Sequence, residues 1–323
     1  MLPPLRSSLA ALALASLVVL PAPGGAEPPR PATFSIVAAD AEAGEVGVAV
    51  ASRFFAVGAV VPYARAGVGA VATQASANTT YGPRALELLA RGATPAETLD
   101  ILTRDDPDRS RRQAGVVAAD GRSATHSGAD CNAWAGGRNG PGYAVQGNIL
   151  AGEAVVAAME RAFLDTAGQP LAERLYAALA AGDAAGGDSR GKQSASLLVV
   201  RAGGGYGGKD DRAIDLRVDD HAEPIVELGR LVGLGLVNDL WNRGWAAFRD
   251  GRRGEDLEWQ ELTLAKAEAI GAAVLPEVLY DVAVIRLANG DAAGARAALE
   301  RALALNPKLA QQAASDSDLA GLR

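Results

Sequence analysis

The side chains most used in nucleophilic and metal chemistry are scarce in this chain, which has one Cys and two His. His126 precedes Cys131 in the segment THSGADC, and a Cys–His nucleophile pair is one interpretation of this segment. The alternative is a His at a strand end that bonds to the following loop, beside a small buried Cys. One Cys cannot form an internal disulfide, and two His disfavour a His-based metal cage. We therefore expect no metal ion and no cofactor, and chemistry by hydroxyl, amide, carboxylate or backbone groups.

Two glycine-rich stretches resemble nucleotide-binding motifs but lie in the wrong context. The stretch 186–192 has the Gly and Lys spacing of a phosphate loop, yet Gln193 stands where a Ser or Thr must bind Mg²⁺. The stretch 203–208 has the dinucleotide spacing, but it leads into a predicted strand rather than into a helix N-terminus. Both stretches are predicted to be loops beside strands, and nucleotide binding is not expected.

The composition places the chain among mixed α/β proteins. Its 323 residues are 49% hydrophobic, which excludes a disordered chain, and its length favours a large domain followed by a smaller one. The formal net charge of -7 argues against a nucleic-acid partner, because such a partner needs a basic face.

The first 26 residues are predicted to be a secretory signal peptide. Arg6 supplies the positive charge, and residues 9–20 form a nearly unbroken apolar run, shorter than the ~20 residues that span a bilayer. Small residues at 24–26 favour cleavage after Ala26, which predicts a periplasmic or secreted protein with no membrane span after cleavage. An uncleaved membrane anchor is the alternative.

Strands and helices alternate from Thr33 to about Leu236. Two hairpins are predicted, over 33–52 and 114–127, with further strands over 68–74, 194–201 and 213–218. Helices are predicted over 83–91, 94–104, 153–166 and 171–181 and from Pro224, and Thr94 with Glu97 forms a capping box. Hairpins interrupted by helix pairs predict two antiparallel sheets packed together with helices outside.

The segment 237–323 is predicted to form a separate helical domain. It lacks strand signals and contains three of the four Trp residues. Residues 279–307 are typical of two antiparallel helices joined at 289–291, with small residues at the spacing of a tetratricopeptide-like unit. Residues 241–251 resemble the first helix of a preceding, degenerate unit.

Several ordered motifs resemble one bacterial family. They are TFSIVA at 33–38, GVAVASRFFAVG at 47–58, ATQ at 72–74, YGPR at 81–84, HSG at 126–128, AWAG at 133–136, QGNIL at 146–150, RGKQSA at 190–195 and DLRVDDH at 215–221. Together they resemble the N-terminal-nucleophile (Ntn) hydrolase-like proteins grouped as domain of unknown function 1028, over about 33–236. The resemblance implies an α+β fold, a four-layer αββα Ntn-hydrolase-like sandwich, here followed by a small all-α helical-repeat domain. Some members of that family carry a C-terminal segment described as peptidoglycan-binding, which implies that role for the helical segment.

The chemistry that the resemblance implies is amide hydrolysis by an N-terminal nucleophile, a role that falls on Thr33. The base would be the α-amine of Thr33, whose ordinary pKa is about 7.7–8.0. Signal cleavage would leave residues 27–32 in front of it. Either the bond before Thr33 is cut, or Thr33 is a β-branched residue that begins a strand. Asn78, His126 and Asn148 are expected to line the site, each on a loop after a strand, although each could equally satisfy turn backbone.

Two hypotheses follow from these observations. The first is an exported amidohydrolase that acts on a small amide or peptide-like substrate. The second is a non-catalytic binding protein whose C-terminal helices dock peptidoglycan or a protein partner. A structural scaffold that forms a homo-oligomer is a third, weaker interpretation.

Overall fold

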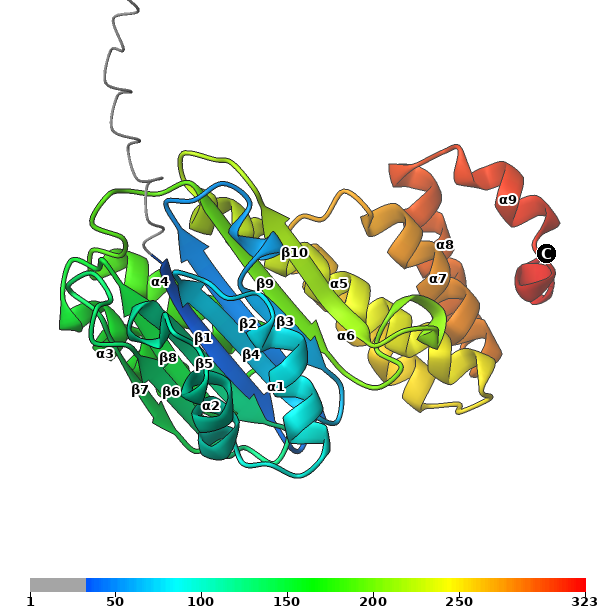
Figure 1. Ribbon diagram of the computed structural model, residues 1–323. Helices are drawn as coiled ribbons and strands as arrows, with labels where there is room; N and C mark the ends of the chain where they lie inside the picture. Colours follow the sequence, from blue (N-terminus) through cyan, green and yellow to red (C-terminus); the bar gives the residue numbers. More distant parts are fainter. Residues whose placement is uncertain (1–32) are drawn as a thin grey trace, which may run out of the picture. The chain divides into compact units, whose positions relative to one another are not determined.

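The structure is a computed structural model that describes residues 33–323, so the predicted signal over 1–26 and the segment 27–32 lie outside the described residues. Two antiparallel sheets form its centre (Figure 1). Sheet A has the strand order β10-β9-β2-β1-β8-β7, and sheet B has the order β3-β4-β5-β6. The strands are β1 Thr33–Asp40, β2 Glu45–Ser52, β3 Pro62–Arg65, β4 Gly69–Ala75, β5 Arg112–Ala118, β6 Ser123–Ser127, β7 Gly136–Gly140, β8 Tyr143–Asn148, β9 Ser194–Val200 and β10 Arg212–Val218.

The two sheets are the inner layers of a four-layer sandwich. Successive side chains of a strand point to opposite faces of its sheet, so one face packs against the other sheet and the other face packs against helices. In β1, Val37 faces sheet B and joins a core with Val48 of β2 and Val117 of β5. The neighbouring positions Phe34 and Ile36 face the other way and pack against helices. The covering helices are α3 Glu153–Asp165, α4 Leu171–Ala184 and the start of α5 Pro224–Arg249 on sheet A, with α1 Tyr81–Ala90 and α2 Pro95–Arg104 on sheet B. The coarse prediction of two packed antiparallel sheets between helices is confirmed.

Local sequence accounts for several of these elements. The first predicted hairpin is confirmed, because β1 and β2 pair from Thr33 with Ser52 to Asp40 with Glu45 around a four-residue turn. The turn ends at Gly44, whose φ of +66° suits a residue without Cβ. The predicted capping box is present at α2, where Thr94 Oγ1 accepts the Glu97 N–H at 3.2 Å and the Glu97 carboxylate accepts the Thr94 N–H at 2.8 Å.

Helix α5 connects the sandwich to the C-terminal helices without a break. Its buried apolar residues up to Leu236 contribute to the core of sheet A, and those from Val237, with the partly buried Leu234, contribute to a second core among the helices. The helices that follow are α6 Glu255–Ala269, α7 Leu275–Ala288, α8 Ala292–Leu305 and α9 Leu309–Ser315. The predicted helix pair is confirmed as α7 and α8, joined at 289–291, and residues 241–249 are the last turns of α5.

A buried ion cluster fixes α5 to the sandwich. Asp239 of α5 binds Arg201, which follows β9, at 2.7 Å and binds Arg243 at 2.9 Å. Arg243 also reaches Glu45 of β2 at 2.8 Å, and Arg201 pairs with the same carboxylate. Within residues 33–323, no helix is long and apolar enough to cross a membrane.

Candidate functional site

Four polar residues lie side by side at one end of sheet A, on the face turned toward sheet B. Asn148, Thr33, Ser52 and Ser194 are consecutive Cα partners across β8, β1, β2 and β9. Directly paired residues present their side chains on the same face of a sheet. Each of the four is at most 2% exposed, and Thr33 Oγ1 lies 3.2 Å from Ser52 Oγ. We call these four residues the Thr33 row.

Sheet B places a second polar row opposite the first. Gln74, Gln113 and Ser127 are Cα partners across β4, β5 and β6. The Gln113 Oε1 accepts hydrogen bonds from Gln74 Nε2 at 2.8 Å and from Asn148 Nδ2 at 2.9 Å. The Gln113 Nε2 donates to Ser127 Oγ at 2.7 Å and to the Gly147 carbonyl at 2.8 Å. Gln113 therefore joins the two sheets and fixes the orientation of the Asn148 amide.

The amide network also holds the backbone of Thr33. Gln74 Nε2 donates to the Thr33 carbonyl at 3.2 Å. One layer deeper, Ser35 Oγ donates to Gln74 Oε1 at 2.6 Å and receives Gln146 Nε2 at 2.6 Å. A buried polar network whose members are bonded to one another specifies a single arrangement of its side chains. Thr33 is therefore held by its carbonyl and bonded through its hydroxyl.

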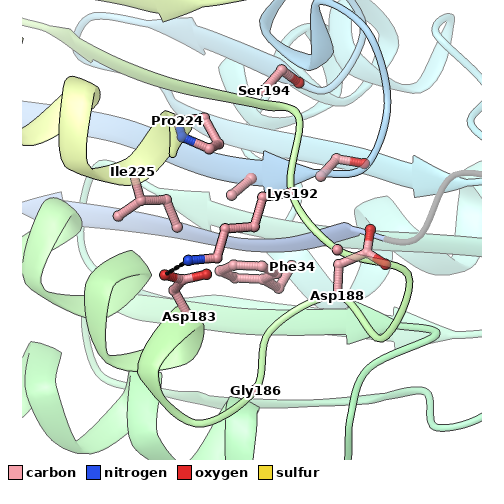
Figure 2. Close-up of a pocket in the computed structure, with 11 residues that line it drawn as sticks. Phe34, Asp183, Gly186, Asp188, Lys192, Ser194, Pro224 and Ile225 are labelled. Atoms are coloured by element: carbon pink, nitrogen blue, oxygen red, sulfur yellow. Dashed lines mark hydrogen bonds and ion pairs between the residues drawn. The ribbon is translucent and has the colours of Figure 1, made fainter. Parts of the chain in front are cut away.

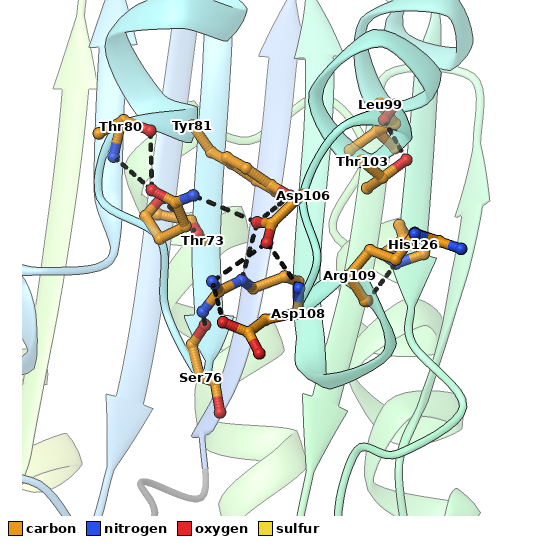
Figure 3. A network of polar contacts seen from close by, with 12 residues as sticks. Thr73, Ser76, Thr80, Tyr81, Leu99, Thr103, Asp106, Asp108, Arg109 and His126 are labelled. Atoms are coloured by element: carbon orange, nitrogen blue, oxygen red, sulfur yellow. Dashed lines mark hydrogen bonds and ion pairs between the residues drawn. The ribbon is translucent and has the colours of Figure 1, made fainter.

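Of the residues expected to line a site, the structure brings Thr33 and Asn148 together. Asn148 is the last residue of β8 rather than a loop residue, and it is the Cα partner of Thr33. Asn78 lies on the loop between β4 and α1, as expected, but belongs to a separate network (Figure 3). Its Oδ1 accepts from the Thr80 N–H and hydroxyl at 3.1 and 2.7 Å, and its Nδ2 donates to Asp106 at 3.2 Å.

Asp106 is the centre of that second network. Its carboxylate receives the Tyr81 hydroxyl at 2.8 Å, Arg112 Nε at 3.0 Å and the Asp108 N–H at 2.9 Å. The Arg112 guanidinium holds the pKa of the Asp106 carboxyl well below its usual range, aided by the Tyr81 hydroxyl. Burial, together with Asp106, raises the pKa of the Tyr81 hydroxyl. This network ties the loops before α1 and β5 together, and Arg112 adjoins Gln113 in β5.

His126 lies within β6 rather than on a loop, and it faces away from the polar rows. Its Cα partner is Ala114, which packs in the core under α1 and α2. The His126 Nε2 lies 3.3 Å from the Arg109 carbonyl (Figure 3). Cys131 Sγ instead contacts the Arg112 carbonyl at 3.4 Å, and burial raises the pKa of its thiol. No hydrogen bond joins His126 to Cys131 in the part of the chain described, and a raised thiol pKa opposes nucleophilic chemistry there.

The loop between α4 and β9, residues 185–193, closes the end of sheet A beside the Thr33 row. Asp188 accepts the Arg53 N–H at 2.8 Å and pairs with the Arg190 guanidinium at 2.9 Å. Residue 188 also forms a β-bridge with Leu150, just beyond β8. Both glycine-rich stretches are loops beside strands, as predicted, the second connecting β9 to β10.

A pocket of about 120 Å³ opens at this end of sheet A (Figure 2). Its lining includes Phe34, which follows Thr33, and Ser52, which bonds to Thr33. Lys192 and Asp183 form an ion pair of 2.9 Å in it. The pocket therefore adjoins the Thr33 row from the helix-covered side of the sheet.

Sequence reasoning assigned no role to Gln74, Gln113 and Gln146. Their partners come from strands distant in the chain, so the network itself has no signal in sequence spacing. An amide at an inward-facing position of an otherwise apolar strand, as in YAVQGN over 143–148, is the local sign that could have marked them.

Comparisons with known proteins place the sandwich in a family. The sequence profile of the family of unknown function DUF1028 matches residues 33–228. The crystal structure of protein SPO2555 from Silicibacter pomeroyi, a DUF1028 protein, is similar at 31% identity with a TM-score of 0.57. That similarity covers 62% of this chain and 84% of the other. No curated protein matches. Over residues 33–323, no three His, Cys, Asp or Glu side chains gather as metal ligands.

Proposed function

Because this chain belongs to the DUF1028 family, whose members have no assigned function, we propose its activity from the geometry of the Thr33 row. We propose that the sandwich is an Ntn-hydrolase-like fold and that Thr33, once it is the N-terminal residue, hydrolyses a small amide or peptide-like substrate. We further propose that this takes place in the periplasm or outside the cell.

The observation that carries the proposal is the position of Thr33 at the first residue of β1, inside the polar network. Its hydroxyl lies 3.2 Å from Ser52 Oγ, and its carbonyl receives Gln74 Nε2. Hydrolysis of the bond before Thr33 would free its α-amine at the end of a strand whose remaining pairing with β2 and β8 continues to Asp40 and Ala38. Thr33 would then supply both the nucleophile, its hydroxyl, and the base, its α-amine, at the end of a strand that is paired on both sides.

The reaction would proceed in two steps. The Thr33 Oγ1 forms a bond to the substrate carbonyl carbon while its proton passes to the α-amine. The C–N bond then breaks, and the same proton leaves with the departing amine. Water hydrolyses the resulting ester and restores the Thr33 hydroxyl, so the net change is amide plus water to carboxylic acid plus amine.

Asn148 is the side chain best placed to stabilise the oxyanion of that reaction. Its Nδ2 carries two hydrogens, and one of them is donated to Gln113. Among residues 33–323 the second hydrogen has no acceptor, and Asn148 is the Cα partner of Thr33. Gln74 Nε2, by contrast, already contacts three oxygens, those of Thr33, Gln113 and Gln146. Asn78 and His126 have no role in this proposal, because their bonds lie in the Asp106 network and at the Arg109 carbonyl.

The test compares a chain produced with Met directly before Thr33, so that removal of Met frees Thr33, with the same chain extended by residues 27–32. Release of amine or ammonia is measured on a panel of small amides. We expect hydrolysis by the chain that begins at Thr33 and by its Thr33→Ser variant, and none by Thr33→Val, which keeps the shape without the hydroxyl. Equal activity of Thr33→Val and the unaltered chain would refute the proposal.

A further inference from the structure

The Lys192–Asp183 pair gives the pocket beside Thr33 an unusual charge pattern for so small a space (Figure 2). Lys192 Nζ lies 2.9 Å from Asp183 Oδ2 and 2.8 Å from Glu223 Oε2. Glu223 and Asp183 raise the pKa of the Lys192 ammonium, so this group stays charged at neutral pH. The side chains of Lys192 and Asp183 are 38% and 19% exposed, so both remain within reach of a ligand.

Each member of the pair keeps an unused hydrogen-bonding position. The ammonium has three hydrogens, and two are accounted for by Asp183 and Glu223. Asp183 uses Oδ2 for Lys192, and in the described residues its Oδ1 receives no hydrogen bond. A positive donor and a negative acceptor therefore lie next to each other, each able to bind one more group.

The walls of the pocket combine apolar residues with Ser52, Ser194 and Asp188, the last of which is paired with Arg190. Phe34 and Ile225 line it, and Gly187, with a φ of +50°, lets the loop approach the Phe34 ring. A Cβ at Gly187 would lie 3.4 Å from that ring and 3.5 Å from Asp183 Oδ1. A volume of about 120 Å³ exceeds the roughly 10–15 Å³ that a single water needs, and it is enough for a charged head group with one or two methylenes.

The α-amino and α-carboxylate groups of a free amino acid match this pattern in charge. The α-carboxylate would bind the third hydrogen of Lys192, and the α-ammonium would bind Asp183 Oδ1. The side chain would then extend along Phe34 toward Ser52, which lines the pocket and whose Oγ lies 3.2 Å from Thr33 Oγ1.

We propose that the Lys192 pocket binds the zwitterionic end of the substrate, and that the substrate is the side-chain amide of a free α-amino acid. This inference rests on the proposed function, because it requires the amide carbonyl to reach Thr33 around the end of β1, of which Thr33 is the first residue. Hydrolysis consumes one water and yields an amino diacid with ammonia or an amine.

The experiment measures binding in the Thr33→Ala protein, so that it does not depend on catalysis. L-Glutamine and L-asparagine are titrated by calorimetry against the same compounds acetylated at the amine or amidated at the α-carboxylate. We expect saturable binding of at least one free amino acid, and a loss of about tenfold or more for each blocked form, the loss typical of one charge-assisted hydrogen bond. No saturable binding, or equal binding of free and blocked forms, would overturn the proposal.

Variants locate the binding site. Lys192→Met and Asp183→Asn are expected to weaken binding by about tenfold or more. Glu223→Gln, which removes the second partner of Lys192 but does not line the pocket, is expected to change it by less than threefold or so. Unchanged binding in Lys192→Met would place the ligand elsewhere and contradict the proposal. Because ligand blocking is tested in one protein, a variant that fails to fold leaves that result intact.

The two proposals fail in different ways. Binding that meets these expectations, without hydrolysis by the chain that begins at Thr33, supports the pocket and refutes the nucleophile. Hydrolysis of amides that lack a zwitterionic end, without binding of free amino acids, refutes the pocket and supports the nucleophile.

Discussion

Replacing Asp281 by Asn should remove a pH-dependent penalty from the helical segment. Asp281 Oδ2 on α7 accepts the indole N–H groups of Trp241 and Trp245 on α5, at 2.8 and 2.7 Å. Burial raises the pKa of this carboxyl, the two indoles lower it, and the neighbouring carboxylates Asp316 and Glu277 raise it, so that the pKa lies at about 6.

The sign and size of the effect follow from linkage. The folded chain binds the Asp281 proton more tightly than the unfolded chain, whose Asp pKa is near 3.8. The stabilisation from protonation is therefore fully present below about pH 4 and is lost as the pH rises through about 6. A shift from 3.8 to about 6 corresponds to about 3 kcal/mol in the free energy of unfolding. Asn keeps an oxygen for the indoles but carries no charge.

The assay is urea unfolding followed by circular dichroism at pH values from 4 to 8, for the unaltered chain, Asp281→Asn and a control, Glu258→Gln. Glu258 is exposed on α6, and its carboxylate takes part in no ion pair or hydrogen bond among the described residues. We expect Asp281→Asn to gain about 2.5 kcal/mol of stability relative to the unaltered chain between pH 4 and pH 7.5. A difference between the two that stays constant with pH, or that shrinks as the pH rises, refutes the reasoning.

Five further substitutions test other parts of the structure. Asp239→Ala leaves Arg201 and Arg243 partly uncompensated and should lower the free energy of unfolding by about 3 kcal/mol. Asp250→Ala, at a pair whose Asp side chain is 63% exposed, should cost less than about 1 kcal/mol, and a loss in urea unfolding equal to that of Asp239→Ala would contradict the role of the buried cluster. Thr94→Ala should lower stability by about 1 kcal/mol through loss of the capping box, and an unchanged melting temperature would speak against it. Asn148→Ala should reduce the rate of amide hydrolysis about 100-fold or more, whereas Asn78→Ala should lower the melting temperature with little change in that rate. The reverse pattern would contradict the assignment of the site to Asn148.

Local patterning was sufficient to predict much of the fold. The β1–β2 hairpin, the capping box of α2 and the α7–α8 pair each depend on residues close in sequence. Strands β3, β7 and β8 were not predicted, and neither β3 nor β7 has a strand pattern. The segment GGRNG of β7 lies at an edge, and its pairing with β8 makes it a strand. Similarly, α5 continues past residue 236 because burial of Val237 and the ion pairs of Asp239 favour the helix there.

The site was predictable only in part. Thr33 and Asn148 could be selected from the sequence because a hydroxyl can act as a nucleophile and an amide can donate hydrogen bonds. Pairing of β1 with β8 makes them neighbours. Gln113 is hydrogen-bonded to Asn148 and Gln74, which are 35 and 39 positions away in the sequence. At that separation local periodicity carries no information about contacts. His126 could not be excluded from sequence, because a shift of one residue along β6 decides which face it occupies.

The mature N-terminus of the protein recovered from cells tests the central claim most directly. Mass spectrometry before and after periodate, which cleaves a free N-terminal Thr between Cα and Cβ, reads both the starting residue and its free amine. The account predicts a chain that begins at Thr33 and loses mass with periodate. A chain that begins at Glu27, unchanged by periodate, would contradict it.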